Sequence, residues 1–169
     1  AADVASIGLS GVYSMVPVDA QANPLRAGGI MYGVDTRSVA EIAEVIGWHG
    51  AETIFNRTGN GLSAQSMGPK ILWLKKHEPE AYRKARSFLP CANFIAARLT
   101  GRFHIDHLTA GFFGPCYEPS KLAWAADLCE GIVEPDRLPQ PRWATEAAGT
   151  VTADAARKTG LSEGTVVSI

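Results

Sequence analysis

Apolar and polar residues between Gly68 and Glu80 follow the pattern of a helix, a stop and a second helix. The apolar positions are Ile71, Leu72, Trp73 and Leu74, and the polar ones are Lys70, Lys75, Lys76 and His77. This pattern predicts a short amphipathic helix over residues 69–77, with a proline at its first position, where a missing N–H costs nothing. Pro79 ends that helix and begins a second one over residues 79–86. On pattern alone, these are two ordinary core helices.

A second apolar stripe predicts a helix that begins after Ser38. Apolar residues recur at i, i+3, i+4 and i+7 from Val39 to Ile46, and Gly47 is expected to end the helix. Glu41 stands three residues after Ser38, which is the spacing of a capping box between a hydroxyl and a glutamate.

The remaining elements are predicted from alternation, caps and breakers. We expect strands at both ends of the chain, a hairpin near the start, four more helices and two loops. The strands are 5–9 and Val166 to Ile169, the hairpin is 14–18 with 29–32 around a turn at 19–24, the helices are 51–56, 93–100, 121–129 and 152–159, and the loops are 57–65 and 135–141.

The fold class expected from these elements is α/β, with residues 1–169 forming a single partial domain. A chain of this length supports one domain and buries roughly two-thirds of its unfolded surface. The apolar strands at the two ends need neighbours on both sides. We therefore expect a mixed sheet flanked by helices and truncated at both ends.

Composition narrows the function classes. Sixteen basic and 17 acidic residues give a net charge of −1, so no basic face for nucleic acid is expected. No apolar run has the length of a membrane span, and no signal-peptide pattern opens the chain. Three cysteines without Cys-x-x-Cys spacing favour reduced thiols over a disulfide framework or a zinc site. These features indicate a cytoplasmic protein that binds neither membrane nor nucleic acid.

Two catalytic or metal-binding motifs are only approximated, and nucleotide-binding motifs are absent from the sequence. Gly8 to Gly11 begins like a nucleophile elbow, but Val12 occupies the place of the final glycine. His104 and His107 have the spacing of metal ligands, yet no third ligand is evident, so a surface or hydrogen-bonded pair is favoured. No Walker-type loop or dinucleotide-binding glycine motif occurs.

Several short motifs, in their order along the chain, resemble the FGGY family of carbohydrate kinases and its xylulokinase-like members in particular. They are Ile7-Gly8-Leu9-Ser10-Gly11, Asp35-Thr36-Arg37, Thr58-Gly59-Asn60, the Lys70–Leu74 signature, Arg98-Leu99-Thr100-Gly101, Asp106, Ala148-Gly149-Thr150-Val151, Thr159-Gly160-Leu161 and Gly164-Thr165. The resemblance implies an actin-like, ribonuclease-H-like fold and a position within the N-terminal domain.

The resemblance also implies an activity, namely transfer of the γ-phosphoryl group of ATP to a sugar or polyol hydroxyl with the help of Mg²⁺. The glycine-rich phosphate loop and the catalytic aspartate of such kinases are expected outside these residues. We therefore place no catalytic residue here and expect residues 1–169 alone to be inactive. A non-catalytic sugar-binding or oligomerisation module derived from the kinase fold stays as the alternative. A small sugar substrate and a homodimer are the partners implied.

Four candidate substrate-binding residues follow from the resemblance before the signature helix. Tyr13 and Ser14 stand where xylulokinase-like members place a Met and a His that approach the sugar, and both can offer hydroxyls. Asp35 and Arg37 match a family motif whose first residue is a Trp, here Gly33. Asp35 as a plain turn or cap residue is about equally favoured.

Two further candidates are Gln65 and Asp106. The Gln65 side chain lies in the loop before the signature helix, where its amide is able to hydrogen-bond a substrate. The alternative, an exposed loop amide without a role in binding, is slightly favoured. Asp106 matches an acidic segment close to the family's site, and a helix cap for the segment starting at His107 is the preferred interpretation.

Overall fold

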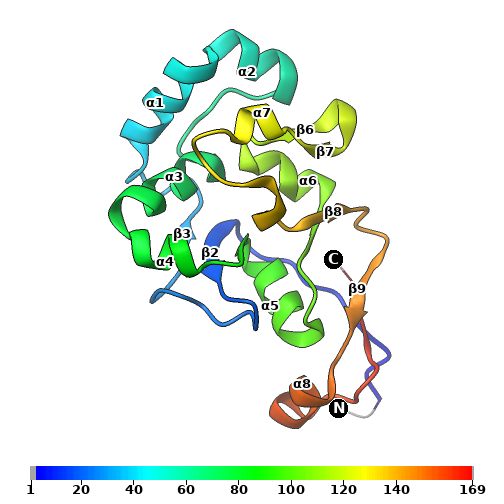
Figure 1. The fold of residues 1–169 in the computed structure, drawn as a ribbon. Coiled ribbons are helices and arrows are strands. Elements are labelled where there is room, and N and C mark those ends of the chain that lie inside the picture. Colours follow the sequence, from blue (N-terminus) through cyan, green and yellow to red (C-terminus); the bar gives the residue numbers. More distant parts are fainter. Residues whose placement is uncertain (1–2, 169) are drawn as a thin grey trace.

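The computed structural model describes residues 3–168, in which two three-stranded sheets are accompanied by two pairs of short strands (Figure 1). Strands β2 (Ser14–Val18) and β3 (Ile30–Met31) pair antiparallel, and β4 (Ser87–Leu89) pairs antiparallel with the other edge of β2. The predicted hairpin is therefore confirmed. Strand β4 was not predicted, because it lies between the helices expected over 79–86 and 93–100, in residues to which no element was assigned.

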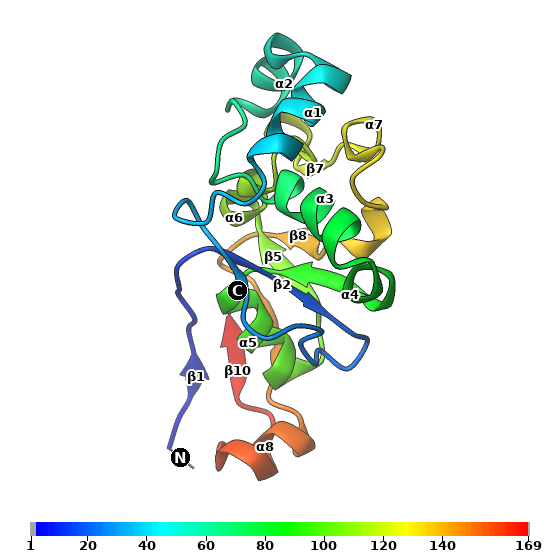
Figure 2. The same ribbon diagram turned by 90° about the vertical axis from the view of Figure 1, so that its left-hand side faces the viewer.

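The second sheet joins segments from the two ends of the described chain. Strand β10 (Val166–Ser168) lies between β1 (Ser6–Ile7), to which it is parallel, and β9 (Ala147–Thr150), to which it is antiparallel. Figure 2 shows β1 and β10 side by side. The mixed sheet is as predicted, and Ile169 lies outside the described residues.

Helices cover both sheets. Residues 39–100 supply five of them, namely α1 (Val39–His49), α2 (Ala51–Thr58), α3 (Met67–His77), α4 (Pro79–Lys84) and α5 (Cys91–Thr100). In Figure 1, α1 and α2 form one end of the molecule, and α8 (Ala153–Thr159) lies at the opposite end. Helix α5 lies between them and packs against both β2 and β10.

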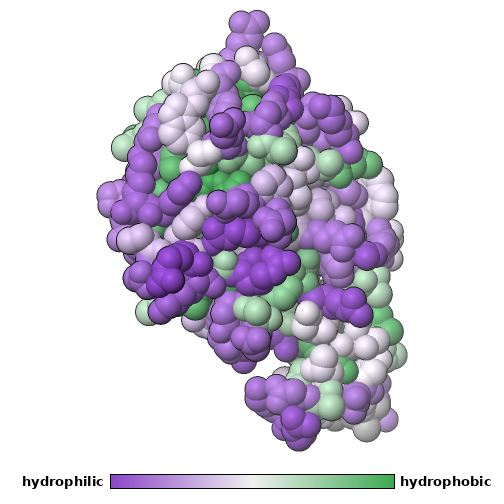
Figure 3. Space-filling model, viewed as in Figure 1, coloured by the Kyte–Doolittle hydropathy of each residue, from purple (hydrophilic) through white to green (hydrophobic). Residues whose placement is uncertain are grey.

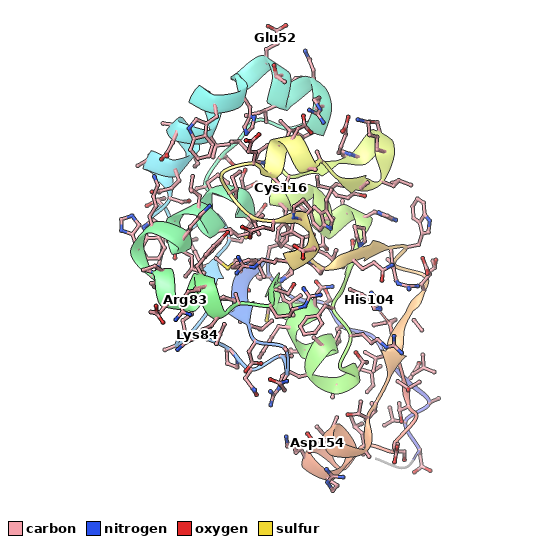
Figure 4. All side chains as sticks on the ribbon, in the orientation of Figure 1. Glu52, Arg83, Lys84, His104, Cys116 and Asp154 are labelled. Carbon is pink, nitrogen blue, oxygen red and sulfur yellow. The ribbon has the colours of Figure 1, made fainter. Side chains whose placement is uncertain are left out.

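The largest hydrophobic cluster fills the space between the β2–β3–β4 sheet and helix α3. Its fully buried members include Met15, Ile30, Ile71, Leu74 and Phe88. Cys116 belongs to the same cluster and lies in the interior in Figure 4. All three cysteines are free thiols, as predicted, and Cys91 is the one that is not buried.

The capping box predicted at the start of α1 is wrong. The Ser38 hydroxyl is buried and makes no capping hydrogen bond. Glu41 instead forms an ion pair with Lys76 at 3.5 Å, and His77 Nε2 lies 3.7 Å from the same carboxylate oxygen. The glutamate is thus engaged by the basic end of α3 instead of the start of its own helix. The buried stripe is displaced as well, because Val45 is fully buried whereas Val39 is 58% exposed.

Helix α3 begins two residues earlier than predicted, so Pro69 occupies its third position. The N–H of that position is also free of intrahelical bonding, which explains why a proline is tolerated there. Helix α4 ends at Lys84 instead of residue 86, because Ala85 is extended and the chain enters β4. Helix α2 reaches Thr58, so the loop predicted over 57–65 starts later.

The segment from residue 104 to 142 departs most from prediction. It contains β5 (His104–Asp106), α6 (His107–Ala110), a 3-10 turn at Gly111–Phe113, β6 (Tyr117–Glu118), a 3-10 turn at Pro119–Lys121, β7 (Ala123–Trp124), α7 (Ala126–Cys129), a 3-10 turn at Pro135–Arg137 and β8 (Gln140–Arg142). The helix predicted over 121–129 is wrong in its first half. Leu122 adopts a positive φ of 52°, and the chain forms a hairpin in which Tyr117 packs edge-on against Trp124.

The loop predicted over 135–141 is also only partly correct, because β8 pairs in parallel with β5. Two helix ends, by contrast, follow prediction. Gly101 and Gly160 end α5 and α8 with φ of 69° and 74°, and Thr152 caps α8 through its side chain.

The face shown in Figure 3 is hydrophilic over α4 and α8. Arg83 and Lys84 extend outward from α4 in Figure 4, and Asp154 marks α8. Within residues 3–168, no helix is both long enough and apolar enough to cross a membrane.

Candidate functional site

A cleft of about 240 Å³ opens where the end of β1 meets the start of α5 and the junction of β5 with α6. The segment after β1 contributes Ser10, Gly11 and Tyr13 to its wall. Asn93 of α5 and Asp106 face it from the other side. The cleft therefore brings together two of the predicted site residues, Tyr13 and Asp106, and lines them with hydroxyl, amide and carboxylate groups.

Asp106 is both a helix cap and part of this cleft. Its Oδ1 accepts a hydrogen bond from the backbone N–H of Thr109 at 2.8 Å, which caps α6 and confirms the preferred interpretation of this residue. Its second oxygen makes no hydrogen bond among residues 3–168. One carboxylate oxygen thus stabilises the helix, and the other is free to accept a hydrogen bond from a ligand.

Three aromatic rings pack against one another beside the first cleft, and one of them, Tyr13, lines it. Tyr13 stacks on Phe112 with ring centroids 4.2 Å apart, and Tyr32 packs against both at 5.4 and 5.7 Å. Phe112 lines a second cleft, which holds about 140 Å³ and includes Gln65. Gln65 is exposed there, as the favoured interpretation of it as a loop amide requires.

Phe112 was not predicted as a site residue. The sequence feature that could have indicated it is the pair of adjacent phenylalanines between Gly111 and Gly114, because two adjacent side chains rarely both point into the core. Phe113 is the fully buried member, and Phe112 is the one that lines the second cleft.

Asp35 and Arg37 bind each other. Arg37 Nε lies 2.8 and 3.0 Å from the two carboxylate oxygens, and the Arg37 backbone N–H donates to Oδ1 at 3.2 Å. These hydrogen bonds hold the pKa of Asp35 below its usual value, so the carboxylate is ionised at neutral pH. Asp35 is therefore a turn residue and at the same time a charged acceptor with most of its side chain shielded from solvent.

Two residues of the predicted motifs, Ser14 and Gly33, do not line either of these clefts. Ser14 is buried in β2, on the face that Val16 and Val18 turn toward α5, and it lines neither of the clefts described above. Gly33 adopts φ of 67°, and a Cβ placed on it meets only Gln65 Cγ, at 3.7 Å. The turn thus has room for a side chain but a backbone conformation that disfavours one.

Lys70 is the residue that sequence reasoning placed wrongly, because it is not on the polar side of its helix. Its side chain is fully buried, and Nζ donates to the backbone carbonyl of Asp35 at 2.8 Å. Burial lowers the pKa of the Lys70 ammonium. The sequence feature that indicates this burial is the spacing of Lys70, which stands four residues before the buried Leu74 and so lies on the same face of the helix.

His107 belongs to a hydrogen-bonded pair. Its Nδ1 lies 2.6 Å from the hydroxyl of Tyr117, and its ring packs edge-on against Trp143. No group of three or more His, Cys, Asp or Glu side chains among residues 3–168 is arranged to hold a metal ion.

Solved structures with this arrangement define the class as actin-like sugar kinases. The xylulose kinase from Rhodospirillum rubrum matches with a TM-score of 0.83 and 27% identity, over 95% of this chain and 34% of that one. The gluconate kinase from Lactobacillus acidophilus, at 19% identity, shares the fold with a TM-score of 0.81, over 99% of this chain and 34% of that one. The actin-like fold expected from the resemblance is therefore confirmed.

The sequence identifies the family. The N-terminal domain of the FGGY family of carbohydrate kinases matches residues 1–169, and the chain belongs to this family. It is 30% identical to the xylulose kinase of Bacillus subtilis over 99% of this chain, and 30% identical to the autoinducer-2 kinase of Klebsiella pneumoniae over 78% of it. The chain spans 33% and 25% of those two relatives.

Proposed function

We propose that these residues form part of a single N-terminal domain in an ATP-dependent kinase that phosphorylates a hydroxyl of a sugar or polyol. The observation that carries this proposal is the match to the FGGY N-terminal domain along residues 1–169. Relatives named for xylulose, autoinducer-2, glycerol and L-fuculose all match, so we propose a substrate related to xylulose without choosing one sugar.

The chemistry of the clefts supports polyol binding. Each hydroxyl of a bound sugar needs a hydrogen-bond partner once it leaves water. The free oxygen of Asp106 and the hydroxyl of Tyr13 are such partners in the first cleft. The ionised carboxylate of Asp35 lines neither cleft, and we propose it as a third partner from its place in the family motif. Arg37, Gln65 and Ser14 complete the proposed set, with Arg37 acting through Asp35.

Binding of ATP and Mg²⁺ is not assigned to these residues. The described part of the chain offers no acidic cluster that fits a divalent cation. We propose that residues outside this chain supply the general base and the phosphate-binding loops. The present residues then contribute one wall of the sugar site, in a cytoplasmic enzyme that forms a homodimer.

The test is phosphorylation of a panel of ketoses, aldoses and polyols by the intact protein, followed by kinetics of Asp35→Asn. Losing a charge-assisted hydrogen bond costs about 1.5–3 kcal/mol, so kcat/KM for the sugar is expected to fall roughly 10- to 150-fold. The KM for ATP should remain unchanged. Asp19→Asn is the matched control, because Asp19, like Asp35, accepts a hydrogen bond from the backbone N–H two residues further on, but it lies in the hairpin turn.

Two results separate the alternatives. A lower melting temperature with intact sugar kinetics in Asp35→Asn means that Asp35 is only a turn residue. Sugar binding by the intact protein without phosphoryl transfer favours the non-catalytic module.

A further inference from the structure

Lys70 is a charged residue in a place where charges are rarely found. Its side chain has no exposed surface, and a buried ammonium is costly unless it is paired and hydrogen-bonded. The hydrogen bond that it makes crosses 35 residues of sequence, from helix α3 to the backbone oxygen of Asp35. A residue kept in so unfavourable a position indicates that this cross-link matters to the segment it holds.

A second residue of α3 holds the same segment, residues 33–37, which we name the Asp35 loop. The guanidinium of Arg37 lies over the ring of Trp73, 4.7 Å from its centroid. Trp73 stands three residues after Lys70, so both side chains leave the same side of one rigid helix. The loop is therefore held at Asp35 by a hydrogen bond and at Arg37 by a cation–π contact.

The charges in this assembly alternate. The Asp35 carboxylate interacts electrostatically with the Lys70 ammonium and with the Arg37 guanidinium, which binds it directly. Each cation stabilises the carboxylate and repels the other cation. The carboxylate is thereby kept ionised and in one orientation, while Lys70 itself remains enclosed.

We propose that Lys70 is a positioning residue, which fixes the Asp35 loop so that the Asp35 carboxylate meets the sugar in a single geometry. Lys70 does not touch the substrate, and Trp73 acts with it by holding Arg37. The inference rests on the proposed function, because it takes Asp35 to be a sugar-binding group.

The first experiment compares Lys70→Met with Lys75→Met in the intact protein. Lys75 is the matched control, because it also donates to a backbone carbonyl at 2.8 Å from α3, but to Gly131. We expect Lys70→Met to raise the KM for the best sugar of the panel about tenfold, with the KM for ATP unchanged. Lys75→Met should leave both constants within about twofold of wild type. Equal effects of the two substitutions on sugar KM would overturn the proposal.

A double-mutant cycle tests whether Lys70 acts through Asp35. In an Asp35→Asn background, Lys70→Met should change the sugar KM by less than about twofold, because the group that it positions has already lost its function. Independent, multiplying effects would show that Lys70 acts elsewhere.

The second experiment does not depend on enzymatic activity. Hydrogen–deuterium exchange of the peptide that contains residues 33–38 should become at least about tenfold faster in Lys70→Met and remain unchanged in Lys75→Met. Unchanged exchange in Lys70→Met overturns the positioning role even if no sugar is phosphorylated. Failure of the whole sugar panel, in contrast, overturns only the proposed function.

If Lys70→Met does not fold, Trp73→Leu tests the same loop. This substitution removes the ring under Arg37 and retains an apolar side chain. We expect faster exchange of the same peptide and a higher sugar KM, and wild-type values for both would overturn the proposal.

Discussion

Gly68, in the first turn of α3, offers a prediction whose sign contradicts the usual helix rule. Replacing a helical glycine by alanine generally stabilises a protein by up to about 1 kcal/mol. At Gly68, however, an added Cβ would lie 2.4 Å from the backbone oxygen of Gly114 and 3.1 Å from Pro115 Cδ. Because real Cβ contacts do not fall below 3.0 Å, the two backbones must separate by at least 0.6 Å, which is 3.0 minus 2.4.

The expected cost follows from overpacking. Forcing an extra carbon into a packed site costs about 1–3 kcal/mol, and a clash with backbone belongs in the upper part of that range. After the gain in helix propensity is subtracted, Gly68→Ala should destabilise the protein by about 1–2 kcal/mol. Because Gly114 lines the second cleft, the displaced segment also alters the surroundings of Phe112.

The measurement is urea unfolding followed by circular dichroism, with the midpoint compared at constant m-value. Gly47→Ala in α1 is the matched control, because no atom lies within 4 Å of its added Cβ. That control should stabilise by roughly 0.5–1 kcal/mol. A Gly68→Ala protein as stable as wild type, beside a stabilised Gly47→Ala, refutes the reasoning from close packing.

Two further predictions concern stability and its dependence on pH. Tyr82→Phe leaves the buried carbonyl of Ile132 without its donor at 3.0 Å and should cost about 1–2 kcal/mol. Burial raises the pKa of Tyr82 to about 12. The stabilisation by the Tyr82 hydroxyl should therefore be complete below about pH 10 and lost as the pH rises through 12. Unfolding midpoints of wild type and Tyr82→Phe, compared at about pH 8 and about pH 11, will show this loss. The Arg57 hydrogen bond lowers the pKa of Asp127 to about 2. The small stabilisation that Asp127→Asn removes at neutral pH should therefore disappear as the pH falls from about 4 to 2, and a difference that persists at about pH 2 would contradict this assignment.

The features that could be predicted from sequence are those determined locally. Glycines 101 and 160 end their helices in the left-handed conformation, and Asp106 caps the helix that follows it. In each case the deciding interaction lies within a few residues of the chain. The hairpin of β2 and β3 was predictable for the same reason, since its turn residues and its alternation are adjacent.

The features that could not be predicted depend on distant partners. Glu41 has the spacing of a capping box, but Lys76 and His77 on another helix bind it instead. Lys70 looks like a surface lysine until the carbonyl of Asp35 is brought to it by the fold. The same holds for the candidate site, where Tyr13 and Asp106 share a cleft that the order of residues does not reveal.

Helix α5 places two adjacent alanines in two different hydrophobic clusters. Ala96 packs with the cluster of Val167 and the β9–β10 sheet, and Ala97 packs with the cluster of Val18 under β2. Rotating or shifting this helix to suit one cluster necessarily displaces atoms in the other. The two sheets are therefore coupled mechanically through the width of a single helix, and side-chain volume at one alanine is constrained by packing at its neighbour. A displacement of α5 at the first cleft, which this helix lines through Asn93, would therefore change the packing against both sheets.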